Sequence, residues 1–172
     1  MALQCLLSDI HVLKGNFDLA QSALEKANEI YQSQPIMQDR VRILLAQARF
    51  EAKQNKFEFA LAKLIEAADM LEKMEGRWWR ARVWLEIGLT HLNRNEPEDV
   101  DQAQNYFRDS LAEFKDMSID YYPDVIIEKL RQVKHVSRAQ AIEHRKVTQE
   151  MAEAGRIQHT FIPIHSPQLP RY

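Results

Sequence analysis

Six histidines and one cysteine are the residues of this chain that would most directly suggest a metal centre or a catalytic site. Zinc sites need such ligands at close spacing, as in an HExxH pair or in paired cysteines. Neither spacing occurs here, because Cys5 is the only cysteine and the histidines are spread out: His11, His91, His135, His144, His159 and His165. We therefore expect no metal, no cofactor and no enzymatic activity.

Phosphate and calcium loops are excluded by similar reasoning. The four glycines are isolated, whereas a phosphate-binding loop needs several together. The acidic run at 96–101 lacks the central glycine and final glutamate of a calcium loop, so we interpret it as the solvated start of a helix. We expect His91 to pack in the core. Of the neighbours Trp78 and Trp79, we expect one in the core and one partly exposed.

The charge and the apolar pattern exclude further classes. The net charge of -2 gives no reason to expect nucleic acid, and the basic excess at 134–172 is interspersed with acidic residues, as on a solvated helix. No apolar run approaches the roughly 18 residues of a membrane span. The first residues lack the basic region and cleavage site of a signal peptide. With one cysteine, no intrachain disulfide forms, and we expect a soluble, cytoplasmic protein.

An internal repeat organises the first two thirds of the chain. The segments 15–31 and 55–71 align at an offset of 40 residues, and a third copy begins at Asp101. In each copy a small residue is followed one turn later by a large one: Ala20 and Leu24, Ala60 and Leu64, Ala103 and Phe107. Small residues allow two helices to cross closely, and the large residue fills the adjoining gap. Gly88 has the same character, so Ala60→Trp or Gly88→Leu should cost several kcal/mol.

The repeat resembles the tetratricopeptide (TPR) superfamily over residues 1–117. Trp84, Ile87, Gly88 and His91 match its first-helix pattern W-x2-L-G-x2-Y, with Ile for Leu and His for Tyr. Helix-forming residues dominate the composition, so we expect an all-α solenoid of about three hairpins. The expected helices are 2–14, 17–33, 36–54, 57–74, 78–93 and 99–117. The exposed apolar start of the first helix suggests a region taken from a longer protein.

A long seventh helix is expected to follow. Pro123 opens it, as proline often does at a first helical turn, and it runs to about Thr160, a length of roughly 50 Å. Beyond it lies a proline-rich stretch, so we divide the chain into repeats at 1–117, a linker helix at 118–160 and a tail at 161–172.

The end of the chain resembles the lead-in to SpoIIE-type bacterial serine phosphatases, relatives of protein phosphatase 2C. The matching residues are Ala154, Ile157, Gln158, Phe161, Ile162, Pro163, Pro167, Leu169, Pro170 and Tyr172. In that family the helix before the catalytic domain relays regulatory input and often dimerises. The metal-binding aspartates of the family would lie downstream and have no counterpart here. The resemblance implies a sensory and dimerisation region upstream of a phosphatase; the alternative is a free-standing TPR adaptor that bridges proteins.

The linker helix has a weak heptad pattern. The apolar positions of this pattern are Val133, Val136, Val147, Ala154, Ile157 and Phe161, and Gln158 is a further candidate linker residue. Three polar positions interrupt the pattern: Gln140, Glu143 and Glu150. Coiled coils prefer apolar residues throughout, so we expect a marginal homodimer of about micromolar affinity. In the competing arrangement the helix folds back on Leu85, Leu89 and Leu92 in a monomer.

In TPR proteins the first helices of the hairpins line a groove that binds protein or peptide segments. The repeat register places Arg42, Arg49 and Arg82 there as a basic stripe, with Leu85 and Leu89 as apolar companions. Such a groove suits an acidic peptide or the chain's own tail. Solvated arginines without a partner are the other interpretation.

Overall fold

The computed structural model describes residues 1–72 and 76–161, without the side chains of 144 and 152–161. The described residues form seven α-helices and no strand, which confirms the all-α class. The helices are α1 (Ala2–Leu13), α2 (Phe17–Ser33), α3 (Met37–Lys53), α4 (Phe57–Glu72), α5 (Arg77–Arg94), α6 (Asp99–Asp116) and α7 (Tyr121–Phe161). The first six agree with prediction to within one residue at every described end, except that α4 ends at Glu72 and the predicted end at 74 lies outside the described residues.

The turns that follow α1, α3, α5 and α6 share one backbone feature. Each contains one residue in the left-handed region: Gly15 (φ 74°), Asn55 (φ 60°), Asn95 (φ 58°) and Ser118 (φ 56°). After α1, the amide of Asn16 donates to the carbonyl of His11 over 2.9 Å. Forty residues later the amide of Lys56 donates to the carbonyl of Glu51 over 3.0 Å. These bonds close Schellman motifs, which satisfy the last carbonyls of a helix and reverse the chain.

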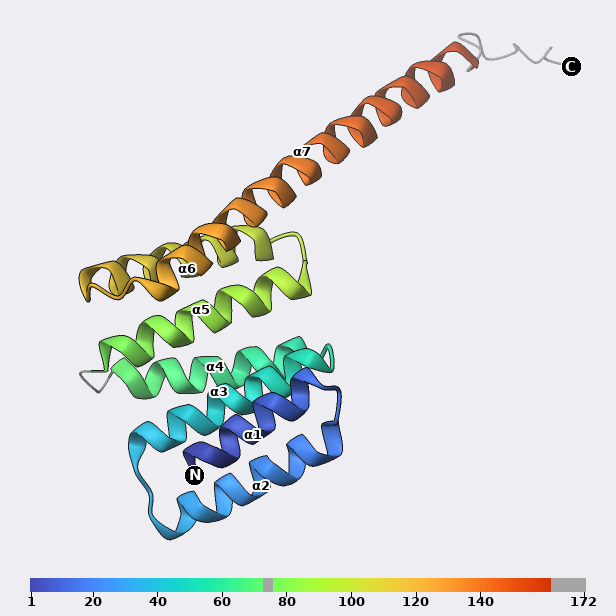
Figure 1. Cartoon of the computed structure of the whole chain (residues 1–172). Coiled ribbons are helices and arrows are strands. Elements are labelled where there is room, and N and C mark those ends of the chain that lie inside the picture. The colour runs from blue at the N-terminus through green and yellow to red at the C-terminus, as the bar shows by residue number, and fades with distance from the viewer. Residues whose placement is uncertain (73–75, 162–172) are drawn as a thin grey trace, which may run out of the picture. The chain divides into compact units, whose positions relative to one another are not determined.

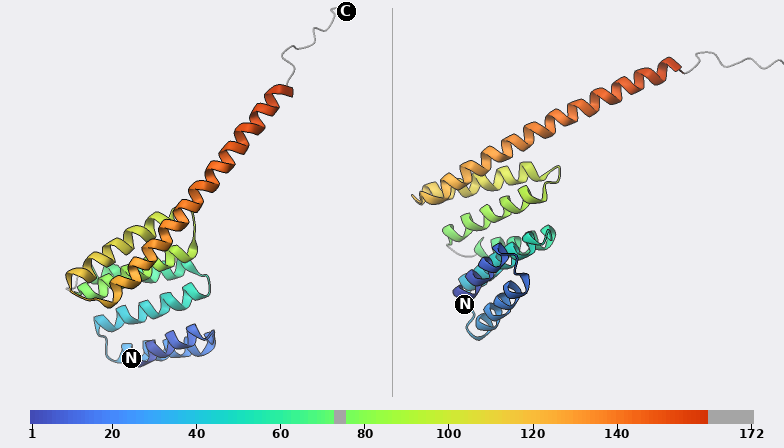
Figure 2. Two further views of the ribbon diagram at one scale, coloured as in Figure 1. Left: turned by 45° about the horizontal axis from the view of Figure 1, so that its top comes forward. Right: turned by 45° about the vertical axis from the view of Figure 1, so that its right-hand side comes forward.

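The first six helices pack as three successive hairpins, α1–α2, α3–α4 and α5–α6 (Figures 1 and 2). The first helices also contact one another in series, α1 with α3 and α3 with α5, and each second helix contacts the first helix of the next hairpin. The repeat positions form the core: Ala20, Ala60 and Ala103 are 0% exposed, and the large residues one turn later are at most 3% exposed. These contacts are those of hairpins stacked in sequence order.

Gly88 lies at a close contact between α5 and α6. A Cβ atom added there would lie 2.6 Å from Cε1 of Phe107, which is fully buried. Near the same crossing, the hydroxyl of Ser110 donates to the carbonyl of Ala81 over 2.7 Å. The predicted close crossing at Gly88 is therefore confirmed, and the backbones approach closely enough for a side chain to bond across.

Helix α7 differs from prediction at its start. It begins at Tyr121, so Pro123 is its third residue rather than its first. Proline is tolerated there because the amides of the first turn have no partner within the helix. The chain divides into two compact units, Met1–Val133 and Lys134–Tyr172, whereas the sequence suggested a boundary at 117/118.

The first part of α7 belongs to the first unit because its apolar side chains are buried there. The Tyr122 ring stacks on Phe114 with centroids 4.5 Å apart, and Ile126 and Val133 are 0% and 1% exposed. The assignment of Val133 to a dimer interface is therefore wrong, because this side chain is already covered. Tyr122 also contacts Trp78 and Arg82 of α5, so this segment packs on α5 and α6. The fold-back onto Leu85, Leu89 and Leu92 stays a prediction.

The second unit is the remainder of α7 together with the tail. Val136 is half-buried, and the exposed apolar side chains include Ile142, Val147 and Met151, at 56%, 41% and 71%. The side chains of Ala154, Ile157, Gln158 and Phe161, and all of residues 162–172, lie outside the described part of the chain. None of the described helices combines the length and the apolar character that crossing a membrane requires.

Candidate functional site

The first helices of the three hairpins share a face that contains two cavities, which we call the groove. The larger cavity has a volume of about 460 Å³, and its lining includes residues of α1, α3 and α5 together with Lys129 of α7. The smaller has a volume of about 220 Å³ and is lined by α1, α3 and α5. Asp9 and Arg49 line both cavities, so they mark the place where the two meet.

An ionic network crosses the groove at this meeting point. Arg49 donates through Nη1 to Oδ2 of Asp9 over 2.6 Å, and through Nε and Nη2 to Oε1 of Glu86 over 3.0 and 2.8 Å. Arg82 pairs with the same Glu86 oxygen at 2.8 Å. We call Asp9, Arg49, Arg82 and Glu86 the groove network. It joins α1, α3 and α5, so it fixes the three first helices relative to one another.

The charges of this network are unevenly compensated. Burial opposes the ionisation of Glu86, yet Arg49 and Arg82 together hold its pKa below the ordinary value. Burial likewise disfavours the Arg49 charge, but the Glu86 and Asp9 carboxylates raise its pKa above the ordinary value. Among the described residues Asp9 forms an ion pair with Arg49 only, so burial prevails and the pKa of Asp9 is raised. Its second oxygen, Oδ1, is buried without a hydrogen-bond partner among the described residues.

The structure brings the predicted groove arginines together but changes their character. Arg42, Arg49 and Arg82 all line the smaller cavity, and Arg42 also pairs with Asp39 at 3.4 Å. The predicted basic stripe did not include the ion pairs that these arginines form with Asp39, Asp9 and Glu86, so much of its positive charge is compensated. The spacing of Arg82 and Glu86, four residues apart in one helix, was the signal that could have indicated their pairing.

The two apolar companions have different positions. Leu89 lines the larger cavity, as expected of a groove residue. Leu85 is 2% exposed and belongs to the core, so it offers no surface to a partner. Residues four apart lie on the same face of a helix, one turn from each other, so only the packing decides which of the two a neighbouring element covers.

Aromatic rings hold two of the groove arginines in place. The guanidinium carbon of Arg42 lies 5.2 Å from the centre of the Trp79 ring, and that of Arg82 lies 5.2 Å from the centre of Tyr122. Trp78 and Trp79 meet edge to face at 4.7 Å and both line the smaller cavity. Both are half-buried, and Trp79 packs against the core. The expectation of one partly exposed tryptophan is therefore met by Trp78, whereas neither ring is fully buried in the core.

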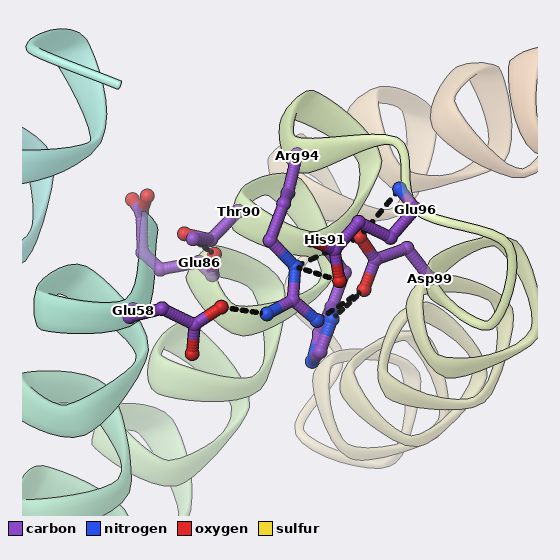
Figure 3. Close-up of polar contacts among 7 residues, drawn as sticks. All are labelled: Glu58, Glu86, Thr90, His91, Arg94, Glu96 and Asp99. Atoms are coloured by element: carbon purple, nitrogen blue, oxygen red, sulfur yellow. Dashed lines mark hydrogen bonds and ion pairs between the residues drawn. The ribbon is translucent and has the colours of Figure 1, made fainter. Parts of the chain in front are cut away.

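A second polar cluster lies at the turn between α5 and α6 (Figure 3). Asp99 is 1% exposed and accepts bonds from Nε and Nη2 of Arg94, at 2.9 and 2.7 Å, and from the Glu96 amide. His91 lies with Nδ1 2.6 Å from the same carboxylate. Burial opposes the ionisation of the Asp99 carboxyl, but these hydrogen bonds hold its pKa well below the usual range. The expectation that this acidic run is solvated is therefore wrong for Asp99.

This cluster has a structural role. Arg94 also pairs with Glu58 of α4, so the cluster ties α4 to the turn that begins α6. His91 stacks on Tyr106 with centroids 6.0 Å apart, which combines the expected packing with a polar contact. Figure 3 shows that the Glu86 side chain, on the same helix, points away from the cluster. Helix α5 thus contributes to two separate networks, one at its turn into α6 and one in the groove.

Within residues 1–72 and 76–161, no group of three or more His, Cys, Asp or Glu side chains is placed to hold a metal ion. Comparisons with protein-family models, with curated proteins and with solved structures find no match to this chain. Function must therefore be argued from the groove and from the sequence patterns themselves.

Proposed function

We propose that this chain is a protein-interaction module whose groove binds a segment of a partner protein. The observation that carries the proposal is the pair of cavities along α1, α3 and α5, joined by the groove network. Binding sites are typically concave and largely apolar, with a few fixed polar groups. Because the network holds its side chains in place before binding, a partner loses less free energy in ordering them.

The charge of the groove favours an acidic partner. Its cationic lining residues are Arg42, Arg49, Lys53, Arg82 and Lys129, against the carboxylates of Asp9 and Glu86. Lys53 is exposed and Lys129 half-buried, and both border the larger cavity. An excess of positive charge raises the rate and selectivity with which acidic segments bind.

We further propose that the module is the regulatory region of a SpoIIE-type serine phosphatase. The sequence pattern at 154–172 supports this, and so does the course of α7. The helix borders the larger cavity at Lys129 and continues without interruption to Phe161, so one element connects the groove to the expected linker. A free-standing adaptor would use the same groove without a phosphatase. A downstream reading frame encoding metal-binding aspartates would support the regulatory proposal, and a stop codon after Tyr172 would contradict it.

Self-association through the second unit belongs to the same proposal. Val147 and Met151 are exposed and lie one turn apart on α7, so they leave an apolar strip in water. Val133 contributes nothing to this strip, since it is buried in the first unit. A dimer through α7 would therefore depend on residues after Val133.

Display of random twelve-residue peptides against the full chain tests whether the groove binds protein segments. Two matched variants locate the binding site: Asn93→Trp places a bulky ring at the larger cavity, and Asn105→Trp places one on α6. Both asparagines are exposed, so neither change should disturb folding, and thermal melting checks this. We expect selected peptides to bind Asn93→Trp at least tenfold more weakly and Asn105→Trp unchanged. Absence of any enriched peptide, or equal binding to both variants, would contradict the proposal.

A further inference from the structure

We infer that the two cavities recognise two side chains of one partner segment, an anionic one in the smaller cavity and an apolar one in the larger, three residues apart. The inference rests on the proposed function of the groove and states the chemistry of its partner.

The smaller cavity is built to hold an anion. Arg42 and Arg82 are 35% and 18% exposed in their side chains, and an aromatic ring orients each guanidinium. Each forms a single ion pair with a carboxylate among the described residues, at 3.4 and 2.8 Å. A guanidinium has five N–H donors, so most of theirs are left for a ligand. Asp9 is the only acidic residue in the described lining, and carboxylates and phosphates both accept such paired donors.

The larger cavity is built to hold an apolar side chain. Its apolar walls include Val12, Leu13, Leu64 and Leu89. Among its charged residues, Asp9, Arg49 and Glu86 pair with one another in the groove network, and Lys53 and Lys129 come from α3 and α7. Leu13 is 81% exposed, so an apolar partner side chain would remove both its own surface and that of Leu13 from water. Burial of apolar surface on both partners is the main source of such binding.

Between the two cavities lies an acceptor that lacks a donor. Oδ1 of Asp9 is buried and unpartnered among the described residues, while Oδ2 is held by Arg49. A buried acceptor without a hydrogen bond is costly, so a donor supplied by a ligand is favoured. An extended segment carries free backbone N–H groups, because no helix or sheet uses them. A segment that spans both cavities would pass this oxygen and could donate to it.

The geometry of α1 sets the spacing of the two side chains. Leu6 lines the smaller cavity and Leu13 the larger, and seven residues of helix span about 10 Å. A polyproline II segment has three residues per turn and rises about 3.1 Å per residue, so positions i and i+3 point the same way about 9 Å apart. The recognised pattern is therefore an anionic residue and an apolar residue three positions apart.

Fluorescein-labelled peptides and fluorescence polarisation with the full chain test this pattern. The peptides carry one Glu and one Leu separated by one, three or five positions in a Pro/Ala background. We expect the i,i+3 peptide to bind at least tenfold more tightly than the others, and replacing its Glu by Gln to cost at least tenfold. Phosphoserine in place of Glu distinguishes the two anions: tighter binding identifies a phosphate partner, and weaker binding a carboxylate partner.

Variants of the chain assign each side chain to its cavity. Arg42→Gln should remove the preference for Glu over Gln and keep the preference for Leu over Ala, whereas Asn93→Trp should do the reverse. Thermal melting verifies that both variants fold. If displayed peptides bind the groove but show no preference for an anion or for the i,i+3 spacing, the inference is wrong while the groove proposal stands. If no peptide of either kind binds, the proposed function itself fails.

Discussion

Adding one methyl group at Gly88 is a direct test of the packing between α5 and α6. The new Cβ would lie 2.6 Å from Cε1 and 2.7 Å from Cδ1 of Phe107. Packed carbon atoms lie about 3.5–4.0 Å apart, so the ring or the helix must move by about an ångström. The Phe107 side chain is fully buried, so it has no open space to move into.

Two effects oppose each other in Gly88→Ala. Alanine is the better helix former, by about 0.8–1.0 kcal/mol in a helix interior. Overpacking a well-filled core costs about 1–3 kcal/mol. The contacts below 3 Å are to a ring that its neighbours hold in place, so we expect the upper part of this range to apply. The net result should be a loss of about 1–2 kcal/mol in the free energy of unfolding, despite the higher helix propensity.

Urea unfolding followed by circular dichroism measures this loss. Phe107→Leu provides the control, because it removes the ring atoms that the new methyl group would strike. The penalty of Gly88→Ala should then shrink by about 1 kcal/mol or more when it is introduced into Phe107→Leu. A Gly88→Ala protein as stable as the wild type would refute the reasoning and show that the crossing is looser than the structure indicates.

Three further predictions concern other parts of the chain. Asp99→Asn should lower stability at neutral pH by about 1.5–3 kcal/mol, since hydrogen bonds to a charged group are lost. The pKa of Asp99 is depressed in the folded state, so its contribution to stability is complete above the ordinary pKa of about 3.9 and declines at lower pH. Urea unfolding at several pH values should therefore show the stability difference between the two proteins shrinking below about pH 4. A difference that stays constant with pH would contradict this. Ser118→Gly should stabilise the fold by about 1 kcal/mol, because serine at φ 56° is strained and glycine is not. Ser118→Ala is the control, and equal melting temperatures for the two variants would count against backbone strain at this position. In analytical ultracentrifugation the full chain should associate with rising concentration and a chain truncated after Val133 should not; monomers in both cases would exclude a dimer through the second unit.

The helices were predictable because their signals are local. The repeat of small and large residues at an offset of 40 placed the hairpins, and the left-handed residues at the turns, such as Gly15 and Asn55, follow from the same repeat. Helix formation depends on neighbouring residues three or four positions apart. The bounds of the six short helices therefore needed no knowledge of which helix packs on which.

The groove was predictable only in part. The repeat register placed Arg42, Arg49 and Arg82 on one face, because equivalent residues of successive hairpins lie side by side in a stack. It did not reveal that Asp9 and Glu86 pair with Arg49 across the hairpins. Those contacts join residues 40 and 37 positions apart, and they depend on how closely the first helices approach.

The sequence by itself determined the all-α class, the hairpin repeat and the small residues at helix crossings, since these depend on composition and short-range periodicity. Only the tertiary structure decided that Asp99 is buried, that Val133 packs in the first unit, and that one carboxylate oxygen of Asp9 has no hydrogen-bond partner in the part of the chain that the structure describes. The physical reason is that the environment of a side chain is set by the elements that cover it. Those elements are distant in sequence, and a pattern within one helix specifies which face is apolar but not which neighbour, if any, covers that face.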